Sequence, residues 1–191
     1  MSDRTYGFDT LAIHAGSRPD PATGARQTPI YQTTAYVFRD ADHAAALFNL
    51  QEVGFIYSRL TNPTVSVLQE RIATLEGGVG AVCCSSGHAA QIMALFPLMA
   101  PGLEVVASSK LYGGSINQMK HSYKKFGWNA VFADPDDPAS FKKAVTDKTR
   151  AIFVESLANP GGTFVDIAAI AKIAHKHGLP FIVDNTMASP Y

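Results

Sequence analysis

Four apolar stretches of this 191-residue chain each end in residues that could hold a small ligand. The endings are SSGH (85–88), LYGG (111–114), ESLANPGG (155–162) and DNT (184–186). In the first ending, a Ser-Gly turn that opens a helix exposes free backbone N–H groups at the positive end of the helix dipole, which suits a phosphate. An ordinary serine cap followed by a glycine turn is the alternative for Ser86 and Gly87.

The other three endings offer a ring, an amide and a carboxylate. Tyr112 could stack on a flat ligand, or pack in a core beside a flexible turn. Asn159 precedes a proline, which favours an extended backbone, so its amide could face the site or serve the turn. Asp184 needs a partner because a lone buried carboxylate is costly, and either a backbone cap or a protonated ring nitrogen could supply one.

Together these groups suit a flat, phosphorylated pyridine better than a dinucleotide. The glycines at 77, 78, 80 and 87 lack the G-x-G-x-x-G spacing and straddle an expected strand. The sequence also lacks a Walker A motif, a G-x-S-x-G motif and a Ser/His/Asp triad. No cluster of metal-ligating residues is evident, because Cys83 and Cys84 are adjacent and have no paired Cys or His elsewhere.

The elements that must position these residues alternate between strand and helix from residue 61 onward. Short apolar runs predict buried strands at 79–84, 103–108, 129–133, 150–156 and 179–184, with Cys83 and Cys84 as small buried residues in the first. Helices are expected at 62–78, 86–99, 113–127, 137–147 and 166–178, with Asn62 as the first N-cap. The pattern predicts an α/β fold with a mostly parallel sheet and helices on both faces, whose functional groups lie beyond the carboxyl ends of the strands.

Residues 1–60 read differently, as an extended arm rich in Pro, Thr and Gly with one short helix capped by Asp40. The arm has no apolar leader, and no stretch of the chain is long and apolar enough to span a membrane. Sixteen basic and sixteen acidic residues balance, without a basic cluster, which argues against nucleic acid or an anionic membrane as partner. A cytoplasmic protein is the expectation.

The stretches YSRLTNPT, LEGG, SSGHAA, LYGG, ESLANP and VDNTMASPY, in this order and spacing, resemble the Cys/Met-metabolism family of pyridoxal-phosphate enzymes. The opening FDTLAIHAGSRPDPATGARQTPIYQTTAYVF most resembles its O-acetylhomoserine sulfhydrylase branch. The resemblance covers essentially the whole chain. It implies the fold type I architecture of the aspartate-aminotransferase-like large domain, with the arm at 1–60 contacting a neighbouring subunit and an incomplete cofactor-binding domain at 61–191.

The resemblance also implies a role for each matching position. Ser86 and the backbone of Gly87 and His88 would hold the phosphate of pyridoxal 5'-phosphate, and Tyr57 and Arg59 would reach the phosphate of the neighbouring subunit. Tyr112 would stack on the pyridine ring and take part in proton transfer, and Tyr57 is a second catalytic candidate. The remaining implied contacts are Asn159 to the 3-oxygen, Asp184 to the ring nitrogen, and Thr186 and Glu155 beside them.

The implied activity is γ-replacement on O-acetylhomoserine by sulfide or a small thiol, giving homocysteine or methionine in a homotetramer of active-site-sharing dimers. Methionine γ-lyase, cystathionine γ-synthase and cystathionine γ-lyase share the same cofactor motifs and are the alternatives. The family's Schiff-base lysine lies beyond DNTMASPY, so we expect this chain to be part of a longer, split or truncated protein. A companion C-terminal fragment is then a possible partner, the 191-residue chain alone is expected to be inactive, and a non-catalytic binding module is the remaining alternative.

Overall fold

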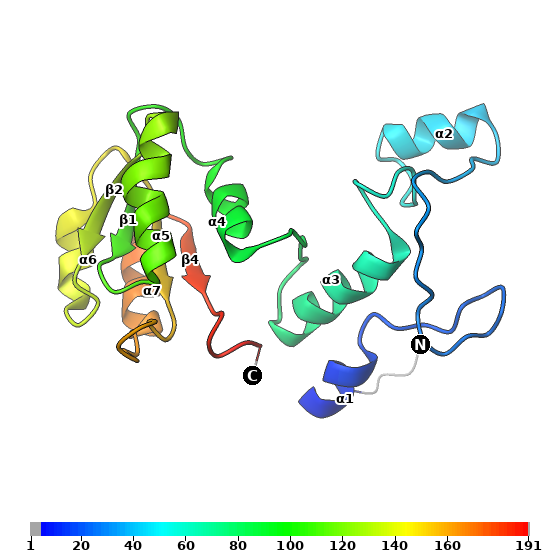
Figure 1. Ribbon diagram of the computed structural model, residues 1–191, viewed down its shortest axis with the longest axis horizontal. Helices are drawn as coiled ribbons and strands as arrows, with labels where there is room; N and C mark the ends of the chain where they lie inside the picture. Colours follow the sequence, from blue (N-terminus) through cyan, green and yellow to red (C-terminus); the bar gives the residue numbers. More distant parts are fainter. Residues whose placement is uncertain (1–4, 191) are drawn as a thin grey trace. The chain divides into compact units, whose positions relative to one another are not determined.

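The computed structural model describes residues 5–190, which form two compact units (Figure 1). One unit runs up to Cys83 and the other begins at Cys84.

The second unit is built on a four-stranded parallel sheet. Its strands are β1 (Glu104–Ser108), β2 (Asn129–Ala133), β3 (Thr149–Glu155) and β4 (Phe181–Asp184), in the spatial order β2-β1-β3-β4. The register places Glu155 opposite Asp184, so that the last residues of β3 and β4 are neighbours. This arrangement confirms the predicted parallel sheet.

Helices cover both faces of this sheet, as the alternation of elements predicted. One face carries α4 (Gly87–Leu95) and α5 (Gly113–Asn117), which continues through a π-helical segment (Gln118–Ser122) and a 3₁₀ turn (Tyr123–Phe126). The other face carries α6 (Pro138–Ala144) and α7 (Ile167–Lys176). Alternate residues of β1 divide between the two layers, with Val105 in the first and Val106 in the second.

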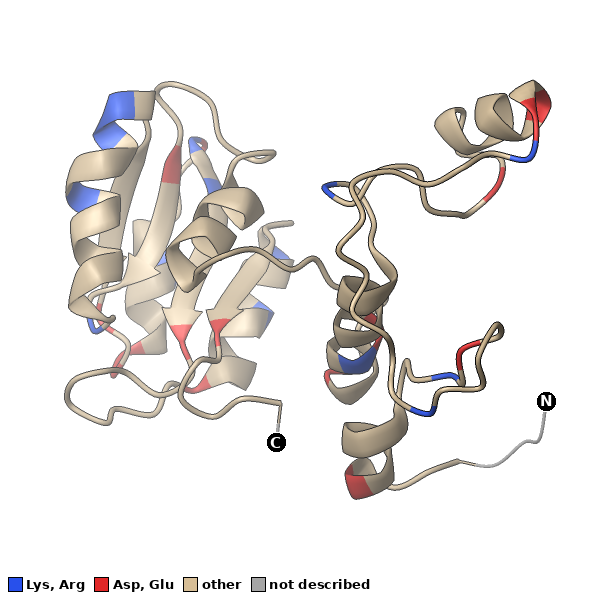
Figure 2. Cartoon of the chain, turned by 45° about the vertical axis from the view of Figure 1, so that its right-hand side comes forward, with Lys and Arg blue, Asp and Glu red and all other residues tan. Residues whose placement is uncertain are grey.

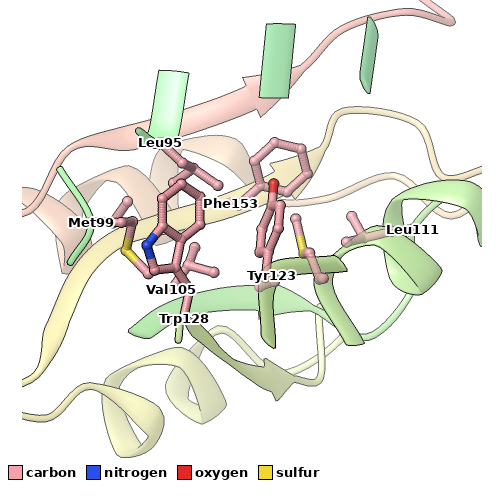
Figure 3. Packing of buried hydrophobic residues seen from close by; sticks show 10 residues of the cluster. Leu95, Met99, Val105, Leu111, Tyr123, Trp128 and Phe153 are labelled. Atoms are coloured by element: carbon pink, nitrogen blue, oxygen red, sulfur yellow. The ribbon is translucent and has the colours of Figure 1, made fainter. Parts of the chain in front are cut away.

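The core of the first face is aromatic. Tyr123 and Trp128 meet edge to face with ring centroids 5.3 Å apart, and Figure 3 shows them among Leu95, Met99, Leu111 and Phe153. The Tyr123 hydroxyl is buried without a hydrogen-bond partner among the described residues, and burial raises its pKa to about 12. This packing fixes α4 and the α5 segment on the sheet, and both helices contribute residues to the site described below.

From residue 5 onward, the first unit has three helices joined by extended chain. The helices are α1 (Phe8–His14), α2 (Ala41–Phe48) and α3 (Pro63–Leu75). Asp40 caps α2 by accepting from the His43 N–H at 2.7 Å, and Asn62 caps α3, as predicted. The sequence did not predict α1. Leu47 is the buried hydrophobic residue of this unit among the described residues, whereas Ile30, Val37 and Leu50 are more than three-quarters exposed.

One predicted strand is wrong. Residues 79–84 form no strand, and both Cys83 and Cys84 are exposed instead of buried. Across the described residues, no backbone group of 79–84 is paired with another strand. An apolar run predicts a strand only when a partner edge is available to its N–H and C=O groups, and local sequence carries no information about that edge.

Candidate functional site

A cavity of about 340 Å³ opens in the second unit at the carboxyl ends of the strands. Figure 2 shows acidic residues at the strand arrowheads, and Glu155 and Asp184 are the last residues of β3 and β4. The cavity brings together seven residues predicted from the sequence as cofactor contacts: Ser86, Gly87, His88, Tyr112, Asn159, Asp184 and Thr186. It is also lined by Gln91, Ser115, Glu155, Leu157 and Met187.

The N-terminus of α4 presents unpaired donors to this cavity. Ser86 caps the helix by accepting from the Ala89 N–H at 3.2 Å. Within the described part of the chain, the N–H groups of Gly87 and His88 donate to no other atom. Both residues line the cavity, and a Cβ at Gly87 would meet nothing within 4 Å. Two free N–H groups at a helix N-terminus can bind an anion such as a phosphate.

Glu155 joins two of the loops that border the cavity. Its Oε1 accepts from the Tyr112 N–H at 2.6 Å, and its Oε2 accepts from the Asn159 N–H at 3.2 Å. The residue is 4% exposed, and burial raises the pKa of its carboxyl group. The negative charge of the neighbouring Asp184 carboxylate raises this pKa further. The two backbone bonds act the other way, because they favour the charged form. Glu155 therefore positions the loops instead of standing free for a ligand.

Asp184 is held in place on both of its oxygens. Oδ1 accepts from the backbone N–H of Thr186 at 3.0 Å and from its hydroxyl at 2.5 Å. Oδ2 accepts from the side-chain amide of Gln91 at 3.2 Å. The local backbone cap that was one alternative for Asp184 is therefore present, and the carboxylate also borders the cavity.

The rings of Tyr112 and His88 lie stacked beside the cavity, with centroids 6.0 Å apart and planes at 29°. Gly114 makes room for both. A Cβ at this position would lie 2.5 Å from Cε1 of Tyr112 and 2.7 Å from Cε1 of His88. A side chain at the second glycine of LYGG would therefore displace the two rings, whereas a Cβ at Gly113 would meet nothing within 4 Å.

The backbone of Asn159 is hydrogen-bonded, whereas its side chain is free to bind a ligand. Its N–H is bound to Glu155, and its peptide bond to Pro160 is cis. Its side-chain amide has no hydrogen-bond partner among the residues that the structure describes, and the residue lines the cavity. The Asn159 amide can therefore bind an oxygen of a ligand.

Sequence reasoning missed Gln91 and Ser115. Gln91 lies inside α4 and Ser115 inside α5, and a hydrogen bond of 2.8 Å joins the Gln91 amide to the Ser115 hydroxyl. No local motif distinguishes them. The available signal was a glutamine on the otherwise apolar buried side of α4, one turn after the Ser-Gly opening.

Tyr57 and Arg59 belong to the first unit, whereas the residues that line the cavity belong to the second. Tyr57 is held by antiparallel pairing between residues 34–36 and 56–58, and the Arg59 guanidinium lies over its ring at 5.0 Å from the centroid. The guanidinium makes no ion pair within the described residues. The two side chains therefore lie together as one cationic and aromatic group.

Two classes of site are not found in residues 5–190. No group of three or more His, Cys, Asp or Glu side chains is arranged to hold a metal ion there. None of the described helices has the length and apolar character needed to cross a membrane.

Comparison with known proteins gives a consistent result. The family model described as Cys/Met metabolism PLP-dependent enzyme matches residues 9–191. The chain is 50% identical over 188 residues to O-acetyl-L-homoserine sulfhydrylase of Leptospira meyeri, covering 98% of this chain and 42% of that protein. It is 46% identical over 184 residues to homocysteine/cysteine synthase of Saccharomyces cerevisiae, covering 95% of this chain and 41% of that protein.

Solved structures extend the likeness to the fold. A putative O-acetylhomoserine (thiol)-lyase from Campylobacter jejuni, which contains N'-pyridoxyl-lysine-5'-monophosphate, superposes with a TM-score of 0.93 at 45% identity over 97% of this chain and 46% of that one. Cystathionine γ-lyase from Lactobacillus plantarum, complexed with L-serine, superposes with a TM-score of 0.87 at 36% identity over 97% and 46% of the two chains. The chain thus spans less than half the length of the relatives that it matches.

Proposed function

This chain belongs to the Cys/Met metabolism PLP-dependent enzyme family, and from that premise we propose that the strand-end cavity of its second unit binds pyridoxal 5'-phosphate. The groups around the cavity fit this cofactor. Two unpaired N–H groups, of Gly87 and His88, suit the phosphate, and an anchored carboxylate, Asp184, suits a protonated ring nitrogen. The single observation that carries the proposal is that donors, ring and carboxylate line one cavity.

The other proposed contacts to the cofactor use side-chain groups that border the cavity. The Tyr112 ring would stack on the pyridine, and its hydroxyl, which has no partner among the described residues, would transfer a proton. The free amide of Asn159 would bind the 3-oxygen. Ser86 would support the phosphate turn, and Thr186 would hold Asp184 while contacting the cofactor. When bound, the cofactor supplies an electron sink for carbanion chemistry.

We propose that the complete protein catalyses γ-replacement on O-acetylhomoserine, with sulfide or a small thiol displacing acetate to give homocysteine or methionine. The support is the naming of relatives at 46–50% identity as sulfhydrylases or homocysteine synthases. A γ-lyase activity is the second candidate, favoured by the likeness to the Lactobacillus plantarum cystathionine γ-lyase at the lower identity of 36%.

Steady-state assays of the complete protein separate these two activities. We expect homocysteine and acetate to form from O-acetylhomoserine plus sulfide, with much slower turnover of methionine or cystathionine alone. Turnover of cystathionine or methionine without any γ-replacement would contradict the first proposal and support the second. The relevant ratio is kcat/KM for each substrate, because it reports differential transition-state binding.

A homo-oligomer in which the first unit completes a neighbour's site is also part of the proposal. The first unit buries little of its apolar surface, and Val65 and Leu68 on α3 are 40% and 51% exposed. Apolar side chains that one unit leaves exposed are available to a protein interface. Arg59, whose guanidinium makes no ion pair within the described residues, would bind the cofactor phosphate of the neighbouring subunit bidentately.

A further inference from the structure

Gln91 is a buried polar residue whose position no sequence motif explains. It lies on α4, one turn after the Ser-Gly opening, and is 6% exposed. Its Nε2 donates to the Ser115 hydroxyl at 2.8 Å and to Asp184 Oδ2 at 3.2 Å. One amide group therefore uses both of its hydrogens, one toward α5 and one toward the carboxylate at the end of β4.

The oxygen of the same amide has no partner. Oε1 of Gln91 is buried and accepts no hydrogen bond within the described residues. Turning the amide over would bring this oxygen against the Asp184 carboxylate, which can only accept, and would leave the Nε2 hydrogens buried without their acceptors. The observed orientation is therefore dictated by Asp184. An apolar side chain of similar size would avoid the unpaired oxygen, so the amide is favoured here by its bonds to Asp184 and Ser115.

We propose that Gln91 is a positioning residue that fixes the Asp184 carboxylate for the ring nitrogen of the cofactor. Thr186 holds Oδ1, and Gln91 holds Oδ2. Because Thr186 donates twice to Oδ1 and Gln91 donates once to Oδ2, the carboxylate cannot rotate about its Cβ–Cγ bond without losing a hydrogen bond. Ser115 in turn holds the Gln91 amide, so α4, α5 and β4 are joined at one point. This inference rests on the proposed cofactor site and adds to it the side chain that orients its carboxylate.

The test is a double-mutant cycle on cofactor binding in the complete protein. Gln91→Met removes both hydrogen bonds with little change in volume, and Asp184→Asn removes the charge that Gln91 is inferred to orient. The dissociation constant of pyridoxal 5'-phosphate and the absorption maximum of the bound cofactor are measured for the wild type, both single variants and the double variant. The absorption maximum responds to the protonation of the ring nitrogen, so a shift shared by Gln91→Met and Asp184→Asn but absent from a packing control distinguishes positioning from a general loss of packing.

We expect Gln91→Met to weaken cofactor binding about tenfold, the effect of one hydrogen bond to a charged group, and to shift the absorption maximum in the same direction as Asp184→Asn. In the Asp184→Asn background, Gln91→Met should have little further effect on either quantity, because residues that act through one another are non-additive. Ser115→Ala removes the other partner of the same amide. The Ser115→Ala variant should weaken cofactor binding by a smaller factor, and again only when Asp184 is present. If Gln91→Met does not fold, Ser115→Ala tests whether the Gln91 amide positions Asp184.

Gln118→Met is the matched control. Gln118 is also a buried glutamine with an unpaired Oε1, but its Nε2 donates to the His88 carbonyl at 3.1 Å and not to Asp184. This variant should leave the absorption maximum unchanged, and any loss of cofactor affinity should be the same with and without Asp184.

Three results would overturn the inference in distinguishable ways. If Asp184→Asn weakens binding and Gln91→Met changes neither affinity nor spectrum, Gln91 has no positioning role and the cofactor site stands. If Gln91→Met has the same effect in both backgrounds, its role is structural only. If Asp184→Asn itself leaves affinity and spectrum unchanged, the proposed contact to the ring nitrogen fails, and the role of Gln91 fails with it.

Discussion

At the scale of single residues, Glu155 is the side chain on which the two cavity loops depend. Its two oxygens accept from the backbone of Tyr112 and Asn159, and both contacts need an acceptor. Glu155→Gln places an NH₂ group against one of these N–H groups. We expect this variant to lose about 1–3 kcal/mol of unfolding free energy, measured by urea denaturation of the complete protein. No change in stability would contradict the structural role of Glu155.

The same residue gives a prediction about pH. Burial raises the pKa of Glu155 above its ordinary value of 4.5, so the folded state holds this proton more tightly than the unfolded state. Its contribution to stability is therefore fully present below the ordinary pKa and is lost as pH rises through the raised pKa. Relative to the wild type, Glu155→Gln should lack this decline in unfolding free energy. Parallel stability-versus-pH curves for the two proteins, starting near pH 4, would contradict the raised pKa.

Alanine substitutions at the neighbouring residues Gly114 and Gly113 should have different effects. Alanine is normally favoured over glycine inside a helix by roughly 1 kcal/mol. Gly114→Ala would nevertheless push its Cβ against the Tyr112 and His88 rings, whereas Gly113→Ala meets open space. We expect Gly114→Ala to weaken binding of pyridoxal 5'-phosphate at least about tenfold, because the ring that stacks on the cofactor is displaced. Gly113→Ala should bind as the wild type does, and equal affinities for the two variants would contradict this account.

At the scale of elements, Asn62 does more than cap α3. Its Oδ1 accepts from the Thr64 N–H at 2.9 Å, while its Nδ2 donates to the Tyr31 carbonyl at 2.9 Å and to the Ser58 hydroxyl at 3.0 Å. The cap thus also fastens the extended chain to the helix. Asn62→Ala should cost about 2–4 kcal/mol of unfolding free energy, which combines the loss of the cap with buried groups left unpaired.

Asp40→Ala is the comparison for this prediction. Asp40 caps α2 in an exposed position by accepting from His43, so its loss should cost only about 1 kcal/mol. Chemical denaturation of both variants measures the difference. Equal losses would show that the contacts of Asn62 to the arm contribute nothing.

Elements with strong local signals were predictable from the sequence, and those that depend on distant partners were not. The four strands of the sheet follow from apolar runs, and helices such as α3 and α6 follow from caps such as Asn62 and Asp137. The predicted strand at 79–84 failed because its pairing edge is not specified locally. Helix α1 was missed because it has no side-chain N-cap at Gly7 and no buried residue, so it lacks both of the usual local signals.

Some residues of the candidate site could likewise be predicted from the sequence, and others could not. Parallel strands bring their carboxyl ends to one edge, so the grouping of Tyr112, Asn159 and Asp184 follows from the order of elements alone. The Gln91 contact joins residues 93 positions apart in the sequence, and no motif in α4 predicts it. The role of Glu155 as a link between two loops was equally hidden, because it depends on backbone N–H groups.

At the scale of the whole molecule, the proposal that subunits share active sites predicts complementation. Arg59 lies in the first unit and Asp184 in the second. If they act in the same site from different subunits, Arg59→Ala and Asp184→Ala should each lose most γ-replacement activity. Subunits of both kinds mixed at random should then recover about a quarter of wild-type activity, since half of the dimers hold one intact site in two. Recovery of none would contradict sharing between subunits.

The central claim is that the cavity bordered by α4, Tyr112 and β4 holds pyridoxal 5'-phosphate. A crystal structure of the complete protein with this cofactor is the most direct test. We predict the phosphate on the N–H groups of Gly87 and His88, and the ring nitrogen within hydrogen-bond distance of an Asp184 carboxylate that still accepts from Gln91 and Thr186. A cofactor bound elsewhere, or bound here with its ring nitrogen away from Asp184, would contradict the account.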